Sequence, residues 1–418
     1  MLTSNENDLL TRTGPGDPGG ELLRRYWQPV ALAEELPTGG APLPVKLLGE
    51  DLVLFRDERG RPGLLGIHCA HRGADLSYGR LEDGGIRCIY HGWLYDRTGR
   101  CLEQPGEPAG STFHQRIRQT AYSCVEAGGL ILAYLGPGEA PLLPDYEFFT
   151  APSEYVAPTK ALVACNYLQA NEGNFDPVHL SFLHRRIESD DDLHVKDVTP
   201  TIDVEETAFG ARVYAIRRVA VDSNFVKVRA FIMPNLGAAA GDGGGGYQVN
   251  WHVPIDDTSH WRYMILFRRT TPFDEGDRRS FRNGVNADYK QSRNRGNRYL
   301  QDRAEMKLGT YTGMGAEFLT HDTAATEGEG LIQDRTQEHL GYTDRAIVAL
   351  RQMLLSAVRD VQEGRDPPHV VRDPAANHFA DIEVTQGLVP SSDSWRGFWK
   401  RDFASVGRSG AVPTRSTS

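Results

Sequence analysis

The chain has 418 residues, of which 39% are hydrophobic and 24% charged, an ordinary composition for a globular protein of two or three domains. Its formal net charge of −10 argues against nucleic acid or an anionic membrane as the main partner. No run of about 18 apolar residues exists and the N-terminus is polar, so we expect neither a transmembrane helix nor a signal peptide, and a cytoplasmic location.

Residues 1–40 predict a short helical segment. Apolar side chains recur at helical spacing from Leu22 to Trp27, which indicates a helix that packs on a neighbouring domain. From about Pro44 the pattern changes to short β-rich runs bounded by Gly or Asp turns. Residues 41–148 are therefore expected to form a small all-β domain.

Two pairs of possible metal ligands lie within this β domain. Cys69 with His71, and Cys88 with His91, are separated by sixteen residues, so two loop tips could present two thiolates and two imidazoles to one point. Such a set could hold one tetrahedral zinc, or a two-iron cluster with both Cys on one iron and both His on the other. The spacing leaves both open. Each pair precedes a flexible turn, a symmetry that favours the cluster, and the stretch closely resembles the Rieske ferredoxin motif.

The stretch from Asn166 to His184 holds a second candidate metal site. Asp176 followed by Pro177 is a common helix start, which puts His179 in the first turn and His184 five residues later. Ideal helical geometry places side chains at this spacing roughly 140° apart. Convergence of the two imidazoles on one metal therefore requires a local distortion, such as a π-type bulge or an unwound end.

A Rieske motif followed about ninety residues later by Asp-x-x-His-x-x-x-x-His resembles the Rieske non-haem iron oxygenases, the catalytic α-subunits of ring-hydroxylating and demethylating systems. The resemblance implies that His179, His184 and a downstream carboxylate bind a mononuclear Fe(II). The resemblance to the phthalate dioxygenase and aryl O-demethylase-like branch implies that the acidic iron ligand is Asp322. The preceding residue is His321, whereas many relatives carry an acidic residue at that position. The competing candidates are Asp334 and Glu338.

The resemblance also implies an α+β fold. Besides the Rieske [2Fe–2S] domain, residues 149–405 would form a catalytic domain with an antiparallel, helix-grip-like sheet flanked by helices, against which residues 1–40 pack. Five strand-like runs between residues 201 and 269 suit such a sheet, and apolar residues from Ile347 to Val358 predict an amphipathic helix. Residues 406–418 are expected to be a disordered tail.

For activity, the resemblance implies a terminal oxygenase that takes electrons from a separate NAD(P)H-dependent reductase or ferredoxin, because the sequence has no flavin or nicotinamide fingerprint. In this family Asp176 would link His179, an iron ligand, to a cluster ligand of the neighbouring chain, the partner subunit's His91. Such a head-to-tail contact implies a homotrimer, or a hexamer made of two trimers.

The resemblance to this branch implies an aromatic substrate that carries a carboxylate. The implied reaction is ring dihydroxylation or oxidative O-demethylation. Candidate cations near the substrate, each more often a plain surface charge, are Arg185, Arg186, Lys227 and Arg229. The alternative is a zinc-stabilised binding or scaffold protein without redox activity, in which the two Cys-His pairs fold a β module.

Overall fold

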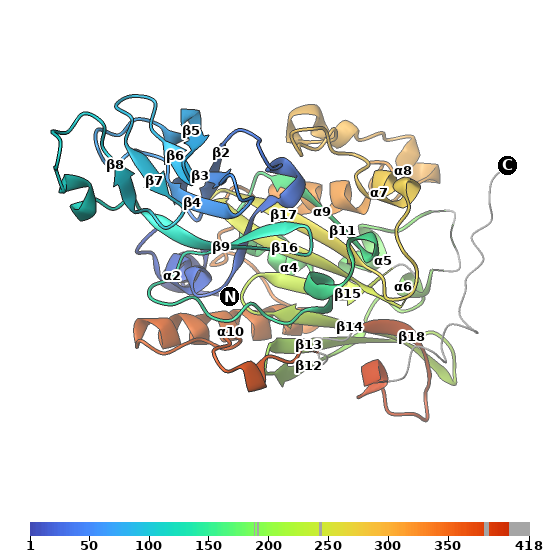
Figure 1. Ribbon diagram of the computed structural model, residues 1–418. Coiled ribbons are helices and arrows are strands. Elements are labelled where there is room, and N and C mark those ends of the chain that lie inside the picture. Colours follow the sequence, from blue (N-terminus) through green and yellow to red (C-terminus); the bar gives the residue numbers. More distant parts are fainter. Residues whose placement is uncertain (188, 190–191, 242–244, 380–383, 401–418) are drawn as a thin grey trace.

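The computed structural model describes residues 1–187, 189, 192–241, 245–379 and 384–400 (Figure 1). A small β domain sits beside a larger domain built on an antiparallel sheet and helices, so the expected α+β class is confirmed. The tail expected at residues 406–418 lies outside the described residues. Within the described part of the chain, no helix is both long and apolar enough to cross a membrane.

Two short helices open the chain, α1 (Ser4–Thr11) and α2 (Pro18–Arg24). α2 begins at Pro18 because the first helical position needs no backbone amide donor. The helix ends at Arg24, before Tyr26 and Trp27, whereas the apolar spacing predicted a helix that includes both residues. Both aromatic side chains are nevertheless buried. Both helices pack against α10 (Arg345–Gln362) of the larger domain.

Two antiparallel sheets build the β domain. The larger has the order β1-β10-β9-β4-β3-β2, and the smaller has the order β5-β6-β7-β8. All five residues of β10 are buried, which is why this segment reads as a continuous apolar run. The strands are β1 (Gln28–Leu32), β2 (Leu43–Leu47), β3 (Glu50–Arg56), β4 (Pro62–Gly66), β5 (Arg80–Glu82), β6 (Gly85–Arg87), β7 (Leu94–Asp96), β8 (Cys101–Glu103), β9 (Ala121–Ala127) and β10 (Leu130–Tyr134).

The larger domain contains an eight-stranded antiparallel sheet of order β11-β17-β16-β15-β14-β13-β12, with β18 paired to β14. The five predicted runs are β12, β13, β14, β16 and β17. Three strands were missed, and β15 illustrates why, since Gly and Ala have low β propensity. The strands are β11 (Val156–Val163), β12 (Thr201–Thr207), β13 (Gly210–Arg218), β14 (Ser223–Ile232), β15 (Leu236–Ala240), β16 (Tyr247–Asp256), β17 (Ser259–Phe267) and β18 (Thr385–Pro390).

Three helices, α10, α4 (Tyr167–Gly173) and α9 (Phe318–Gly328), pack on the eight-stranded sheet or on one another. The predicted amphipathic helix is α10, which packs its apolar face on β12 and β13. α4 packs on β16, and α9 packs on α4. The other short helices are α3 (Glu147–Thr150), α5 (His179–Phe182), α6 (Leu193–Lys196), α7 (Glu275–Phe281) and α8 (Glu305–Leu308).

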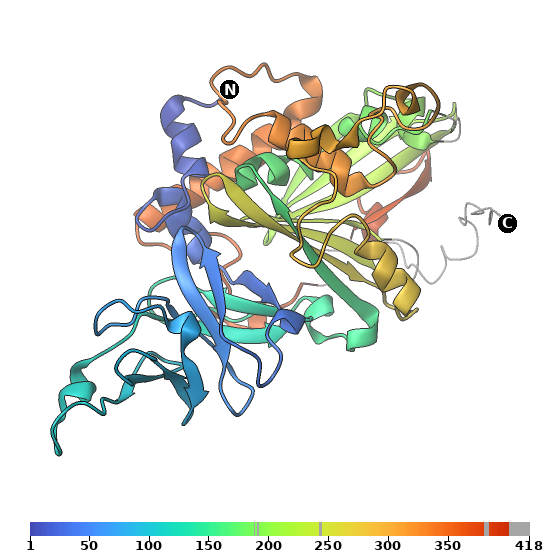
Figure 2. The ribbon, with the colours of Figure 1, turned by 90° about the horizontal axis from the view of Figure 1, so that it is seen from above.

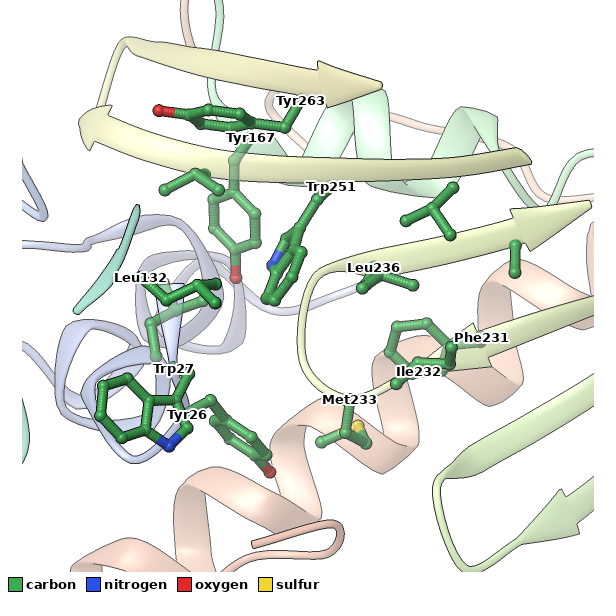
Figure 3. Packing of buried hydrophobic residues seen from close by; sticks show 14 of the residues in the cluster. Tyr26, Trp27, Leu132, Tyr167, Phe231, Ile232, Met233, Leu236, Trp251 and Tyr263 are labelled. Atoms are coloured by element: carbon green, nitrogen blue, oxygen red, sulfur yellow. The ribbon is translucent and has the colours of Figure 1, made fainter. Parts of the chain in front are cut away.

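One hydrophobic core joins the N-terminal segment, the β domain and the eight-stranded sheet. Figure 3 shows Trp27 near Leu132 of β10, with Met233 and Trp251 of the larger domain close by. The Trp27 Nε1 donates a hydrogen bond to the carbonyl of Pro141 at 3.0 Å. The small sheet β5-β8, by contrast, projects at one end of the molecule, away from α9 in both views (Figures 1 and 2).

Candidate metal centres

The two Cys-His loops of the β domain have the same backbone geometry. The Cys69 amide donates to the Ala74 carbonyl at 2.8 Å, and the Cys88 amide donates to the Trp93 carbonyl at 2.9 Å. In each loop a glycine four positions after the cysteine donates back to the cysteine carbonyl; these glycines are Gly73 and Gly92, with φ of 74° and 73°. Glycine adopts this left-handed conformation without steric cost. The chain therefore builds two matching loops that face one another.

The four side chains of these loops come together as the sequence predicted. Cys69 and Cys88 are each 3% exposed. The imidazole rings of His71 and His91 lie 4.5 Å apart between centroids, and His91 is exposed at the tip. The buried Nδ1 of His71 has no hydrogen-bond partner in the described residues. Two buried thiols beside one half-buried and one exposed imidazole fit a two-iron cluster that would be held by both cysteines on one iron and both histidines on the other.

Tyr95 is a member of this site that the motif did not reveal. Its hydroxyl lies 3.2 Å from Cys69 Sγ, and its side chain is fully buried in β7. A cysteine thiolate carries no proton, so the tyrosine must be the donor when a metal is bound. The only signal in the sequence is its position two residues after Trp93, on the strand that follows the second loop.

The geometry argues against one zinc ion at these loops. Ligands of a tetrahedral zinc lie about 2.0–2.3 Å from the metal, which puts them within about 4 Å of each other. In the described part of the chain, three or more ligand atoms of Cys, His, Asp or Glu lie within 4.8 Å of one another at His179, His184 and Asp322. The ligand atoms of the two Cys-His loops do not meet this limit. The loop ligands are spread more widely, as a two-iron cluster requires.

The second centre begins at the short helix α5. Asp176 accepts a hydrogen bond from the Val178 amide at 2.7 Å, but the helix begins at His179, two residues later than the predicted start at Pro177, and its N-cap residue is Val178. The helix ends at Phe182, and His184 lies in the turn that follows. This unwound end, one of the two predicted distortions, brings the ring centroids of His179 and His184 to 5.1 Å.

Asp322 of α9 completes the triad. Its Oδ1 lies 2.8 Å from His184 Nε2, and the ligand atoms of all three residues are within 4.8 Å of one another. The competing carboxylates are elsewhere. Glu338 forms an ion pair with Arg351 at 2.6 Å, and Asp334 accepts a hydrogen bond from the hydroxyl of the nearby Thr336.

The charges of the triad suit a divalent cation. Burial alone would raise the pKa of Asp322, but the contacts with His184 and Arg262 outweigh it and hold the pKa far below its usual range. Burial lowers the pKa of His184, although its contact with Asp322 opposes that shift. An ionised carboxylate and a neutral imidazole are the forms that bind metals.

Asp176 lies beside the triad and not within it. Its Oδ2 is 3.7 Å from His179 Nδ1, which is buried without a hydrogen-bond partner in the described residues. Burial would raise the pKa of Asp176, but the contacts with His179 and the hydrogen bond from the Val178 amide together lower the pKa by more. The carboxylate is thus ionised and 34% exposed, at the surface side of the imidazole.

A cavity of about 190 Å³ opens beside the triad. Lys227 and Arg229, on β14, line it together with Arg262 on β17, whereas Arg185 and Arg186 do not. Its remaining wall includes the small residues from Gly237 to Ala240. Of the four cations considered from the sequence, the fold therefore brings two to the metal site.

Family models match both parts of the chain. A Rieske [2Fe-2S] domain model matches residues 26–120, and a model described as LigXa C-terminal domain like matches residues 133–412. The fold and the two sites thus define an oxygenase with a cluster domain and a mononuclear iron domain. The chain belongs to the family of Rieske non-haem iron oxygenase α-subunits, which carry a Rieske [2Fe–2S] cluster and a mononuclear iron at the catalytic site.

Full-length relatives have known activities. The chain is 35% identical to the phthalate 4,5-dioxygenase oxygenase subunit of Pseudomonas putida, over 97% of this chain and 98% of the relative. It is also 35% identical to the 5,5'-dehydrodivanillate O-demethylase oxygenase subunit of Sphingobium sp. (strain NBRC 103272 / SYK-6), over 90% and 85% of the two chains.

Solved structures share the fold at lower identity. Dicamba monooxygenase bound to dicamba has a TM-score of 0.59 at 18% identity, covering 82% of this chain and 99% of that one. The reduced complex between oxygenase and ferredoxin in carbazole 1,9a-dioxygenase has a TM-score of 0.59 at 21% identity, covering 90% and 97%. At these identities, the likeness shows the fold alone.

Proposed function

We propose that this chain is the terminal oxygenase subunit of a multicomponent system, with residues 41–148, joined by the strand β1 (Gln28–Leu32), as its cluster domain and residues 149–405 as its catalytic domain. The observation that carries the proposal is the convergence of His179, His184 and Asp322. Two distant chain segments supply two imidazoles and one ionised carboxylate, the ligand set of mononuclear iron oxygenases.

A bound cluster supplies single electrons, and a bound Fe(II) supplies oxygen activation next to the substrate. The residues of this chain hold and orient those groups. Asp322 is kept ionised by its partners, and His184 is kept neutral by burial, so both are ready to bind the ion. The side chain of His184 is only 5% exposed, which limits access of water from that side.

Electrons reach the triad, in this proposal, from the cluster of a second subunit. The small sheet that carries the cluster loops projects away from α9 in both views, so the path within one chain is long (Figures 1 and 2). The loop tip exposes 60% of Ile89 and 57% of Tyr90 beside His91, apolar surface of the kind that marks an interface. Docking of this tip near Asp176 of the next subunit, repeated in a ring, gives a homotrimer.

The electron donor to the cluster is proposed to be a separate reductase or ferredoxin. All strand pairings in the described part of the chain are antiparallel, whereas a dinucleotide-binding domain requires a parallel sheet. One structurally similar protein was solved as a complex of oxygenase and ferredoxin, which supports this kind of partner.

The substrate is proposed to be a carboxylated aromatic compound. Burial, reinforced by the nearby charges of Arg229 and Arg217, lowers the pKa of Lys227 well below its usual value. Arg229 and Arg217 repel the charged form of Lys227 and only Asp192 opposes them, so a ligand carboxylate in the cavity would stabilise the protonated lysine. The Gly-Ala wall leaves room for a flat ring beside these cations.

Turnover with a surrogate reductase tests this function. We expect oxygenated product from aromatic acids, including phthalates and methoxylated benzoates, and much less from their uncharged methyl esters. Lys227→Met should raise KM for the acid and leave the metal content unchanged. Equal turnover of acids and esters would reject the carboxylate assignment, and no oxygen-dependent product from any aromatic would reject the oxygenase assignment.

A further inference from the structure

His321, the residue before the proposed iron ligand Asp322, is fully part of the buried site, with 2% of its surface exposed. Its Nδ1 lies 3.2 Å from Nδ1 of His184, and its Nε2 lies 2.9 Å from the carbonyl oxygen of Gly315. The rings of His184 and His321 are inclined by 21°, with centroids 5.4 Å apart. His321 therefore bridges a fixed backbone carbonyl to an imidazole of the triad.

The protons of this bridge follow from donor and acceptor chemistry. A carbonyl oxygen only accepts, so the Nε2 of His321 must carry the proton that it donates to Gly315. A neutral imidazole has one N–H, which leaves a lone pair on the Nδ1 of His321. The facing Nδ1 of His184 must then be the donor, and the lone pair of neutral His184 is on Nε2.

That lone pair points at the triad. The Nε2 of His184 is 2.8 Å from Oδ1 of Asp322, so in this tautomer two atoms with free lone pairs face each other. Two acceptors this close repel unless a cation lies against both. The tautomer favoured by His321 thus directs the lone pair of His184 Nε2 to the centre of the triad, where a metal ion would bind.

The backbone of Gly315, whose carbonyl accepts the hydrogen bond from His321, is itself fixed by other contacts. Its φ of 80° is in the left-handed region that favours glycine. Its amide donates to both carboxylate oxygens of Glu305, at 3.0 Å and 3.2 Å, and Glu305 also accepts a hydrogen bond from the Thr310 hydroxyl at 2.8 Å. Contacts that do not involve His321 therefore hold the Gly315 backbone in place.

We infer that His321 is a positioning residue, which fixes the tautomer and ring orientation of His184 so that Nε2 is presented to the iron. This inference rests on the proposed role of His184 as an iron ligand. Partners that orient metal-binding histidines contribute about 10–100-fold in metal affinity. His321 is not among the residues that line the cavity beside the triad, so it would act through His184.

Equilibrium binding of Fe(II) to the anaerobic protein with its cluster intact tests the inference. His321→Phe keeps the ring volume and removes both hydrogen bonds, so we expect about 10–100-fold weaker Fe(II) binding. His321→Asn keeps an oxygen acceptor near the position of Nδ1, and we expect binding close to that of the wild type. The exposed His339→Asn is the matched control, and the cluster EPR signal reports whether each variant is folded.

Two results would overturn the inference: Fe(II) affinity unchanged in His321→Phe, or equal losses in the Phe and Asn variants, which would indicate packing alone. If the Phe variant does not fold, His321→Leu repeats the comparison with a smaller apolar side chain. His184→Ala separates this inference from the proposed function. Wild-type affinity in His184→Ala would reject the ligand set itself, whereas a loss there with no loss in His321→Phe would reject only the positioning role.

Discussion

Arg262 donates a hydrogen bond from Nη1 to Asp322 Oδ2 at 3.0 Å, while Oδ1 of the same carboxylate faces His184 at 2.8 Å. Arg262 is itself fixed, because its Nε donates to Asn250 Oδ1 at 3.2 Å and its side chain is 9% exposed. The carboxylate plane is thus set by a cation on one oxygen, which leaves the other oxygen directed at the triad.

Replacing Arg262 with Met should therefore weaken the site. Without the guanidinium, Asp322 is free to rotate, and we expect Fe(II) affinity to fall by about 10–100-fold. Equilibrium Fe(II) binding measures the loss, with the exposed Arg345→Met as the control for removal of one positive charge. Unchanged affinity would show that Asp322 needs no support from β17.

Asp176→Asn should separate metal binding from electron supply. Asp176 lies 3.7 Å from His179 and is not part of the triad, so we expect normal iron content. Turnover should fall by about 10–100-fold, the cost common for a residue that supports a metal ligand. Rapid reduction of the cluster, followed by its slow reoxidation in the presence of substrate, would place the defect between the two centres. Normal turnover would reject the proposed path between subunits.

Tyr95→Phe should lower the reduction potential of the cluster. The hydroxyl of Tyr95 lies 3.2 Å from Cys69 Sγ, and a donor to this sulfur stabilises the more negative, reduced cluster. If the hydrogen bond stabilises the reduced cluster by about 1 kcal/mol more than the oxidised cluster, its loss lowers the potential by roughly 40 mV for a one-electron couple. Potentiometric titration of the Rieske EPR signal measures the shift. Tyr78→Phe, at a side chain 71% exposed, should leave the potential unchanged.

His260 makes the stability of the catalytic domain depend on pH. It is fully buried, it donates from Nδ1 to the Cys165 carbonyl at 2.8 Å, and burial lowers its pKa to about 4. In the unfolded chain the same imidazole has a pKa of about 6.5, so the unfolded state binds the extra proton first as the pH falls. Stability should drop by roughly 3 kcal/mol between about pH 6.5 and pH 4 from this group.

The variant His260→Gln should show a shallower loss of stability over that pH range, even if it is less stable at pH 8. Thermal midpoints of both proteins, recorded at matched ionic strength from about pH 8 to about pH 4, provide the comparison. Parallel pH profiles would mean that His260 takes up its proton in the folded state as readily as in the unfolded one.

Most of the proposed metal ligands could be predicted from sequence because they are local. Cys69 to His91 form two short loops, whose residues indicated a metal site but left zinc and a two-iron cluster open. His179 and His184 lie in one turn, where the spacing alone was weak evidence and the family resemblance indicated iron. Asp322 required the family resemblance, since it reaches the site only when α9 packs on α4.

The supporting residues were not predictable in the same way. Arg262 meets Asp322 only through the register of β16 and β17, in which Arg262 pairs with His252. A shift of one residue would turn its side chain to the opposite face of the sheet. The role of His321 likewise depends on the direction of the Gly315 carbonyl, which no local pattern encodes. The small residues of β15 gave no strand signal, yet they line the cavity.

The most direct test of the account is anaerobic iron and acid-labile sulfide analysis of the wild type and of the double variant His179→Ala/His184→Ala, with dithionite-reduced EPR spectra. A Rieske cluster and one mononuclear iron predict three irons and two sulfides per chain. The double variant should retain two irons, two sulfides and the Rieske signal. Zinc in place of iron, or a variant that keeps its third iron, would contradict the assignment of the two centres.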